Sequence, residues 1–253
     1  MRHRRLLPGA VAIVLFFSPF FDAARAASNI LIWPIDPVLK PDDGAAELWI
    51  QNQGSQPTTM QVRIIRWKQE GGSERYSAQQ EVVASPPIVR IDGNKKQLIR
   101  LIKQGAVPAN LEQAYRIVVD EIPQPNSLQK PQMGLKLQMR YSIPLFVYGQ
   151  GIEVQREGTH HALVSTQQLR WQVVNHNGKP AIQVTNNDKI HVRLSEVTVQ
   201  QGSSRRTLAQ GLLGYVLPGS SRSWPLPSGM ANPTQLSASV NARESVWRAP
   251  AQR

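Results

Sequence analysis

The side chains best suited to catalysis or metal binding are four histidines, and their spacing supports neither role. Beyond residue 26 they are His160, His161, His176 and His191. None has a second histidine four residues away, as a helical metal pair requires, and none lies beside a Gly-x-Ser-x-Gly elbow. On a strand, His160 and His161 would point to opposite faces. We expect all four to be solvated loop side chains.

The acidic residues and the cysteine content lead to the same conclusion. Asp42 and Asp43 lie in a turn sequence, and Asp120 and Glu121 would point to opposite faces of a strand end. No glycine-rich phosphate loop is present, and the chain has no cysteine, which excludes disulfides and thiolate ligands. The sequence therefore predicts no catalytic site, no metal site and no cofactor.

Residues 1–26 have the pattern of a cleavable signal peptide. Three of the first five residues are arginine, an apolar run from Leu6 to Phe21 follows, and Ala24–Ala26 gives a small-x-small cleavage site. Pro19 breaks the apolar run, and no later stretch approaches the roughly 20 apolar residues of a membrane span. We predict cleavage after Ala26, or else after Ala27, and an exported protein without membrane insertion.

The chain is basic, but its charges are dispersed. It has 29 Lys and Arg against 17 Asp and Glu, a net charge of +12. Four Arg and one Asp lie in residues 1–26, so the remainder carries about +9. The densest runs are only Lys95–Lys96 and Arg205–Arg206. Nucleic acid, anionic lipid and acidic protein are the usual partners of a basic chain, and export makes nucleic acid the least suitable. We predict no nucleic-acid partner.

Alternation of apolar and polar residues with a period of two indicates strands nearly throughout. It recurs at residues 45–50, 59–67, 115–120, 134–141, 169–174, 181–185 and 192–199. Turn sequences such as Asn177–Gly178 separate these runs. Many short strands over more than 200 residues predict an all-β fold of two immunoglobulin-like sandwiches. We place the domains at residues 27–149 and 150–253.

Six tryptophans leave open an exported two-domain adhesion or carbohydrate-binding module as an alternative. Trp33, Trp49, Trp67 and Trp171 lie in strand-like runs, where we expect them to be buried in a sandwich.

The segment from Gly134 to Ile143 has the most regular alternation. One face would carry Leu135, Leu137, Met139 and Tyr141, and the other Lys136, Gln138, Arg140 and Ser142. One interpretation is an ordinary strand that packs on its own core. The other is a strand that offers its apolar row and its backbone edge to another protein, because an unoccupied edge of this length favours aggregation.

A family resemblance favours the second interpretation. Ser85–Gly93 resembles the Pro-Pro-x-x-Arg-(Leu/Ile)-x-x-Gly segment of the periplasmic pilus chaperones, with one residue fewer before the glycine. Four further segments are similar to that family and follow its order: Trp67–Gly71, Gln97–Leu101, Tyr115–Pro123 and Ile143–Val147. The resemblance covers most of the first domain, and it is looser in the second, at residues 214–220.

The resemblance implies a boomerang of two immunoglobulin-like domains with a cleft between them. The strand Gly134–Val147 would complete the unfinished sandwich of a pilus subunit, with Leu135, Leu137 and Met139 in the subunit's groove and Tyr141 in the same row of the donor strand. The implied partners are pilus subunits and an outer-membrane usher, in the periplasm, with no enzymatic activity. The free protein could also associate with itself through this edge.

The sequence departs from the family at the residues that anchor a subunit's C-terminal carboxylate. The best-studied branch uses an Arg and a Lys, and here those positions are Ile30 and Pro144. The pattern looks closer to the archaic (alternate) branch. Because a guanidinium pairs naturally with a carboxylate, we expect an arginine on the cleft side. Arg116, which interrupts an apolar strand, is the first candidate, and Arg100 is the second.

Two further residues correspond to a structural feature of the family. Arg90 and Glu112 align with a structural salt bridge near the domain junction.

Overall fold

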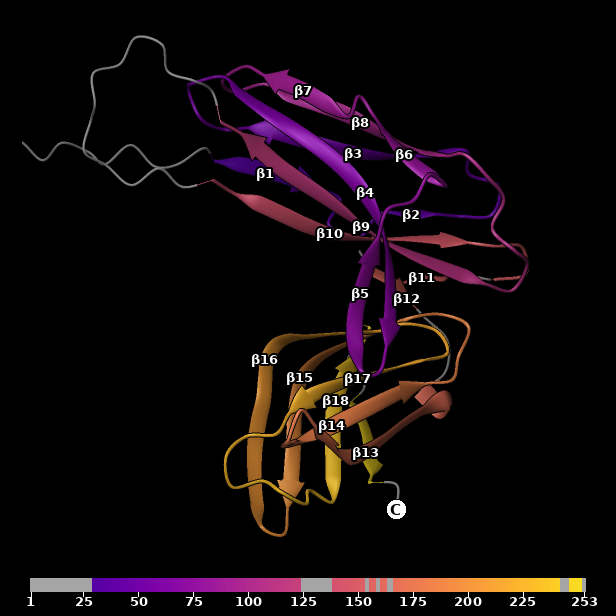
Figure 1. Cartoon of the computed structure of the whole chain (residues 1–253), viewed down its shortest axis with the longest axis vertical. Coiled ribbons are helices and arrows are strands. Elements are labelled where there is room, and N and C mark those ends of the chain that lie inside the picture. Colours follow the sequence, from indigo (N-terminus) through magenta and orange to yellow (C-terminus); the bar gives the residue numbers. More distant parts are fainter. Residues whose placement is uncertain are drawn as a thin grey trace, which may run out of the picture.

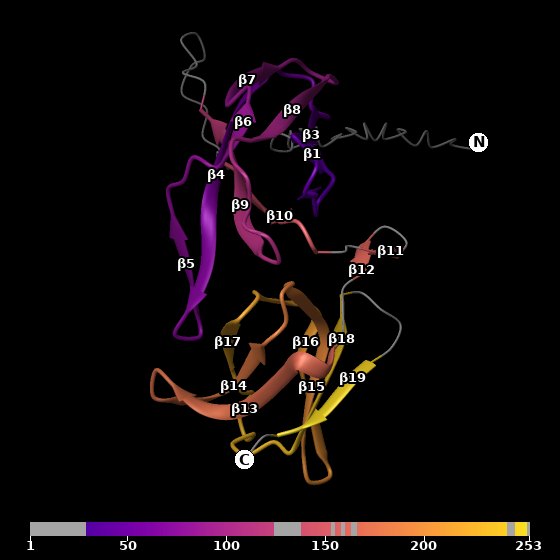
Figure 2. The same cartoon turned by 90° about the vertical axis from the view of Figure 1, so that its right-hand side faces the viewer.

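The computed structural model describes residues 29–123, 138–152, 155–157, 160–162, 166–241 and 246–251. They form two β-sandwiches that lie one above the other along the long axis of the molecule (Figure 1). A hairpin of β4 (Thr58–Glu70) and β5 (Ser73–Ser77) extends from the first sandwich to the second (Figure 2). The predicted signal peptide lies outside the described residues.

The described residues of the first sandwich form ten strands. Besides β4 and β5 they are β1 (Ile30–Trp33), β2 (Val38–Leu39), β3 (Ala45–Asn52), β6 (Val82–Ser85), β7 (Ile88–Ile91), β8 (Lys96–Lys103), β9 (Glu112–Ile122) and β10 (Arg140–Tyr148). One sheet has the order β1-β3-β8-β6. The other has the order β2-β10-β9-β4-β5, with β7 also paired to β4.

Alternation along the strands builds the core of the first sandwich. In β9, Tyr115, Ile117 and Val119 are completely buried, and they pack in one cluster with Leu48 and Ile50 of the facing sheet. Complete burial of such aliphatic side chains contributes about 1.5–3 kcal/mol each. The intervening residues of β9 point away from this core, which is the side that faces the second sandwich.

In the second sandwich, the part that the structure describes has seven strands in two sheets. They are β13 (Leu169–His176), β14 (Lys179–Asn186), β15 (Val192–Gln201), β16 (Ser204–Val216), β17 (Ser220–Pro225), β18 (Gln235–Val240) and β19 (Val246–Pro250). The sheets have the orders β13-β14-β17 and β16-β15-β18-β19. A separate short hairpin of β11 (Gln155–Glu157) and β12 (His160–Ala162) precedes them.

The turn between β13 and β14 illustrates how local sequence sets the register. Asn177 and Gly178 have φ angles of 54° and 78°. Both residues of a two-residue type I′ turn need positive φ, and Asn-Gly is the pair that adopts it most readily. The turn pairs His176 with Lys179 and so aligns every later pair of the hairpin.

The prediction of an all-β, two-sandwich fold is confirmed. The one helical element among the described residues is a 3₁₀ turn at Thr166–Gln168. In the same part of the chain, no helix is long and apolar enough to span a membrane.

Candidate functional site

Strand β10 pairs with β9 through every second residue. The Glu121 N–H donates to the Met139 carbonyl at 3.3 Å, and the Gly149 N–H donates to the Leu111 carbonyl at 2.9 Å. In an antiparallel ladder, bonded and unbonded pairs alternate, so the odd-numbered residues of β10 bond to β9. The even-numbered residues therefore direct their N–H and C=O groups toward the other edge of the strand.

This other edge is covered at one end only. Strand β2 pairs with it in parallel at Phe146 and Val147, and the Phe146 N–H faces the Pro37 carbonyl at 3.4 Å. Between Arg140 and Leu145, no described strand pairs with the edge. In Figure 1, β10 runs along the lower margin of the first sandwich. Unpaired backbone groups of this kind are a template for an additional strand.

The inward side chains of β10 become more exposed to solvent toward the start of the strand. Leu145 and Val147 are fully buried in the first core, and Ile143 is 8% exposed. Tyr141 is half-buried against the same core, and Met139 is 41% exposed. The row is thus sealed at its C-terminal end and accessible at its N-terminal end.

Of the four residues predicted to form the subunit-binding row of the donor strand, the structure describes Met139 and Tyr141. Both lie on the inward face, so the predicted row continues the row of the protein's own core. Because Tyr141 packs partly on that core, Met139 is the more available of the two. Leu135 and Leu137 lie outside the described residues.

Arg116 lies on the opposite face of the sheet, directly in register with Pro144. Its guanidinium carbon is 3.7 Å from the ring centroid of Trp67 and 5.6 Å from that of Tyr215 in the second sandwich. Such contacts hold a cation against aromatic faces. Its Nε is buried and has no hydrogen-bond partner in the described part of the chain. The structure therefore orients this guanidinium between the two sandwiches, beside the strand edge.

The phenol next to Arg116 does not neutralise it. Burial raises the pKa of Tyr215, and the charges of Arg193 and Arg116 oppose the rise. The pKa remains above its ordinary value, so Tyr215 is uncharged at neutral pH.

Arg100 does not share this position. It lies in β8 of the other sheet, across from Glu47 and Ser85. The flanking residues Ile99 and Leu101 point into the core and are fully buried, so alternation turns Arg100 out to solvent. The expectation that it faces the cleft is wrong.

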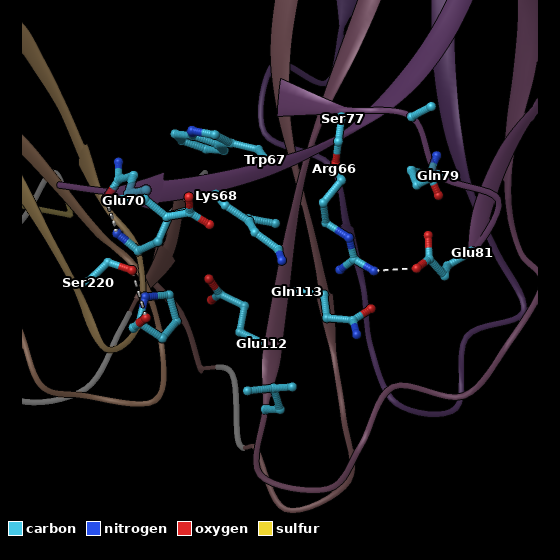
Figure 3. A pocket seen from close by; sticks show the side chains of 16 residues that line it. Arg66, Trp67, Lys68, Glu70, Ser77, Gln79, Glu81, Glu112, Gln113 and Ser220 are labelled. Carbon is cyan, nitrogen blue, oxygen red and sulfur yellow. Dashed lines mark hydrogen bonds and ion pairs between the residues drawn. The ribbon is translucent and has the colours of Figure 1, made fainter. Parts of the chain in front are cut away.

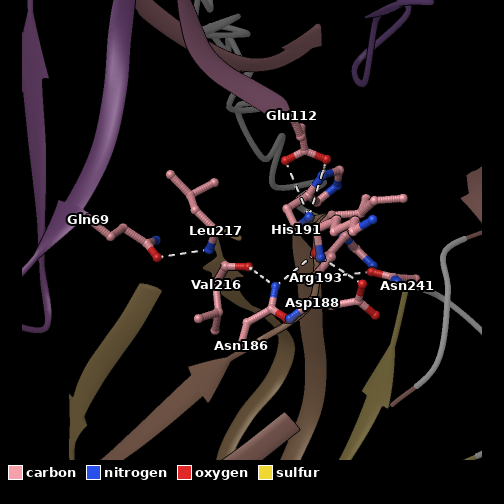
Figure 4. A network of polar contacts seen from close by, with 11 residues as sticks. Gln69, Glu112, Asn186, Asp188, His191, Arg193, Val216, Leu217 and Asn241 are labelled. Carbon is pink, nitrogen blue, oxygen red and sulfur yellow. Dashed lines mark hydrogen bonds and ion pairs between the residues drawn. The ribbon is translucent and has the colours of Figure 1, made fainter. Parts of the chain in front are cut away.

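Glu112 joins the two sandwiches through His191. The Glu112 side chain is completely buried, and its Oε2 lies 2.8 Å from His191 Nδ1. The His191 backbone N–H lies 3.2 Å from both carboxylate oxygens (Figure 4). The imidazole also stacks on Phe146, with ring centroids 3.4 Å apart. Glu112 therefore links the two sandwiches at their junction.

The expected pairing of Glu112 with Arg90 is wrong. Arg90 lies in β7 opposite Thr59, which pairs with Ile122 at the far end of β9. Ten residues of strand separate Ile122 from Glu112, or about 33 Å. Arg90 instead faces Asp92 at 3.9 Å, and both side chains are well exposed.

Two residues of the β4–β5 hairpin add contacts to the second sandwich. Gln69 donates to the Tyr215 carbonyl at 2.8 Å. It also accepts from the Leu217 N–H at 2.9 Å (Figure 4). At the hairpin tip, the Gly72 carbonyl accepts from the Ser223 N–H at 3.0 Å and from Arg222 Nη1 at 2.9 Å. A Cβ at Gly72 would lie 2.5 Å from the Ser223 hydroxyl, so glycine permits this close docking.

Asp120 holds the first residue of β10. It pairs with Arg63 at 2.7 Å and with Arg140, its cross-strand neighbour. Burial raises the pKa of Asp120, but the hydrogen bonds and charges of Arg140 and Arg63 outweigh burial and hold it below its ordinary value. The carboxylate therefore stays ionised and fastens the start of the open edge to β9.

A pocket of about 540 Å³ lies where β4 and β9 meet the 217–220 segment. Figure 3 shows Lys68 pointing into it between Arg66 and Glu112. Arg66 is already paired with Glu81 at 2.5 Å, and Glu70 also lines the pocket. Acidic residues outnumber basic ones here, so the pocket is less suited to a carboxylate than Arg116.

The structure corrects two expectations about histidine. His191 is buried rather than solvated, and His160 and His161 belong to β12 rather than to a loop. Among the described residues, no group of three or more His, Cys, Asp or Glu could hold a metal ion.

The tryptophans divide into two kinds. Trp67 and Trp171 are buried as expected. Trp33 and Trp49 are only half-buried, because they lie on the outer face of the β1-β3-β8-β6 sheet. Their rings stack at 6.2 Å with an interplanar angle of 10°, and Lys96 Nζ lies 4.7 Å from the Trp49 centroid. These contacts occupy the Trp49 ring and leave it poorly suited as a platform for a sugar.

Solved structures share this two-sandwich fold. The chain is similar to CsuC of the CsuC–CsuE chaperone–tip adhesion subunit complex from archaic chaperone–usher Csu pili of Acinetobacter baumannii. The identity is 29% over 87% of this chain and 98% of the other, with a TM-score of 0.70. The SafB chaperone–SafA pilin complex of Salmonella enterica shares the fold, with 17% identity over 90% of this chain and 98% of the other and a TM-score of 0.63. The E. coli chaperone DraB shares it too, with 21% identity over 90% of this chain and 98% of the other and a TM-score of 0.61. No curated protein sequence matches the chain.

Two family models match the chain in succession. The N-terminal domain of PapD, described as a pili and flagellar-assembly chaperone, matches residues 38–153. The C-terminal domain of the pili assembly chaperone PapD matches residues 165–242. Together with the similarity to CsuC, these matches show that the chain belongs to the PapD family of pilus-assembly chaperones of the chaperone–usher pathway and resembles its archaic branch.

Proposed function

We propose that this protein binds pilus subunits in the periplasm by donating β10 to them, and that it delivers them to an outer-membrane usher. The observation that carries the proposal is the edge of β10 from Arg140 to Leu145, which no described strand covers. An extended segment of a subunit can add to such an edge through main-chain hydrogen bonds.

The side chains of the same strand would supply the apolar part of the contact. Met139 is exposed and Tyr141 half-buried, and Leu135 and Leu137 extend the row in the sequence. Each apolar side chain that becomes buried contributes about 1.5–3 kcal/mol. Association and ordering consume part of this gain. The free energy that remains would hold a subunit firmly and would still allow β10 to be exchanged for another strand.

Arg116 is the residue that we propose to anchor the subunit's terminal carboxylate. It lies beside Pro144, at the last uncovered position of the edge, and its guanidinium is already oriented by Trp67 and Tyr215. Its Nε has no hydrogen-bond partner among the described residues, and the side chain as a whole is half-buried. A guanidinium and a carboxylate form charge-assisted hydrogen bonds.

The experiment is co-expression with the small exported proteins encoded beside this chain, followed by affinity capture. We expect wild-type protein to co-purify with at least one of them and Leu137→Asp to capture none, because a carboxylate cannot enter an apolar groove without a large desolvation cost. The melting temperature of Leu137→Asp should remain close to that of wild type. If Leu137→Asp unfolds instead, the row belongs to the protein's own core and the proposal fails.

A second variant tests the anchor separately. Arg116→Ala should reduce subunit capture with little change in melting temperature, and Arg100→Ala, on the solvent face of the other sheet, is its matched control. Equal capture by both variants would show that another residue is the anchor.

A further inference from the structure

The uncovered edge of β10 contains one residue that cannot donate a hydrogen bond. Three even-numbered residues of β10 face this edge before β2 begins: Arg140, Ser142 and Pro144. Proline has no N–H, so within this part of β10 the backbone donors are those of Arg140 and Ser142. All three supply a carbonyl acceptor. The row of backbone N–H donors on this edge is therefore interrupted at Pro144, the last edge-facing residue before the segment that β2 covers.

The side chains of an added strand cannot by themselves fix its position on this edge. A slip of one residue would turn its apolar row to the wrong face and is strongly disfavoured. A slip of two residues restores the alternation, so it keeps the apolar row on the correct face. Besides the proposed Arg116 anchor, the backbone of the edge itself can distinguish two positions that are two residues apart.

We propose that Pro144 sets the register of the strand that this edge accepts, an inference that rests on the proposed function. A strand that slips two residues toward β2 brings a carbonyl opposite the Pro144 nitrogen, where no donor exists. An acceptor left unpaired at a buried contact shifts an equilibrium by about tenfold or more. The aligned strand ends at Ser142 and avoids this loss.

The part of the edge after Pro144 also disfavours a slipped strand. The Phe146 N–H already faces the Pro37 carbonyl of the β2 segment, so a slipped strand finds no free donor beyond Pro144 either. The alternative is that Pro144 is merely tolerated, because an edge strand can accommodate a proline on its unpaired side. The two interpretations differ in the effect of restoring the N–H.

The absence of cysteine allows a direct test by disulfide crosslinking. Ser142→Cys is co-expressed with a captured neighbouring subunit that carries single cysteines at successive positions of its pairing strand. In this background we expect crosslinks at one position. Adding Pro144→Ala should raise crosslinking at the position two residues away by about tenfold relative to the aligned one. Pro180→Ala, in β14 of the second sandwich, is the control and should leave the single position unchanged.

Pro144→Val repeats the test with a residue that favours strands, in case the alanine variant folds poorly. If both variants bind subunit and crosslink only at the wild-type position, Pro144 does not set the register and this inference alone is overturned. If wild-type protein captures no neighbouring protein at all, the proposed function fails and the inference fails with it.

Discussion

The two halves of β10 follow one alternating pattern but have opposite surroundings. From Leu145 to Tyr148 the side chains are completely or almost completely buried, and β2 covers the strand edge at Phe146 and Val147. From Arg140 to Ser142 the side chains are half-buried or exposed, and no described strand covers the edge. The closed half belongs to the protein's own fold, and the open half is the part that we propose this protein donates to a subunit.

On the proposed function, the packing on each half, rather than the side-chain pattern, distinguishes the structural part of the strand from the part offered to a subunit. The inward row runs without a break from Met139 to Val147, and what changes along it is how much of the protein packs on each residue. Strand β2 is only two residues long, so its length determines where the open half begins.

The largest expected effect separates the two halves directly. Leu145→Asp should leave no folded protein, because it places an unpaired carboxylate in the core and removes a fully buried side chain. The combined cost exceeds about 5 kcal/mol, which is a large part of the stability of an ordinary domain. Met139→Asp, in the same row, should fold with a free energy of unfolding within about 1 kcal/mol of wild type. Urea denaturation measures both, and similar losses in the two variants would remove the distinction.

A smaller effect is expected where the closed half meets the second sandwich. His191→Ala leaves the buried Glu112 carboxylate without its imidazole partner and removes the stack on Phe146. Loss of one member of a buried pair costs about 3–5 kcal/mol. His176→Ala, at the end of β13, is the control and should change stability little. A double variant with Glu112→Gln should recover part of the loss, and strict additivity would mean that the two residues are not coupled.

The smallest effect is expected at the start of the open half. Asp120→Asn should weaken the contacts to Arg63 and Arg140 by less than about 1 kcal/mol, as is usual for exposed ion pairs. Amide exchange at Tyr141, which bonds to β9, should become faster, while exchange at Val147 should not change. Equal acceleration at both amides would indicate general destabilisation instead.

The pH dependence of this contact has a definite sign. The folded pKa of Asp120 lies below its ordinary value of 3.8. The contact is therefore fully present above the unfolded pKa, and it is lost as the pH falls through the lower, folded value. Tyr141 exchange, corrected for its intrinsic pH dependence, should be constant from neutral pH to about pH 5 and should increase only in stronger acid.

Much of the fold and part of the site could be predicted from the sequence. Alternation located β4, β9 and β15 because each strand packs one face on a core. Arg116 was recognisable as a charge within an apolar strand. Trp33 and Trp49 were misplaced because alternation alone does not say which face of a sheet is covered.

The contacts between the sandwiches could not be predicted in the same way. His191 meets a partner 79 residues away, and no local pattern reports such a pairing. Arg90 and Glu112 were paired wrongly because a family alignment gives no distance along β9. Gln69 carried a usable signal, since it lies two residues after Trp67 and so shares its face of the strand, a buried position where a polar residue needs a partner.

The apolar cluster between the sandwiches makes each one incomplete alone. Trp67, Phe146 and Tyr148 from the first sandwich pack with Ile190 and Leu217 from the second. A fragment truncated after the first sandwich would expose three large aromatic rings to water and become prone to precipitation. The two halves should consequently melt together, in one calorimetric transition, rather than as independent modules on a tether.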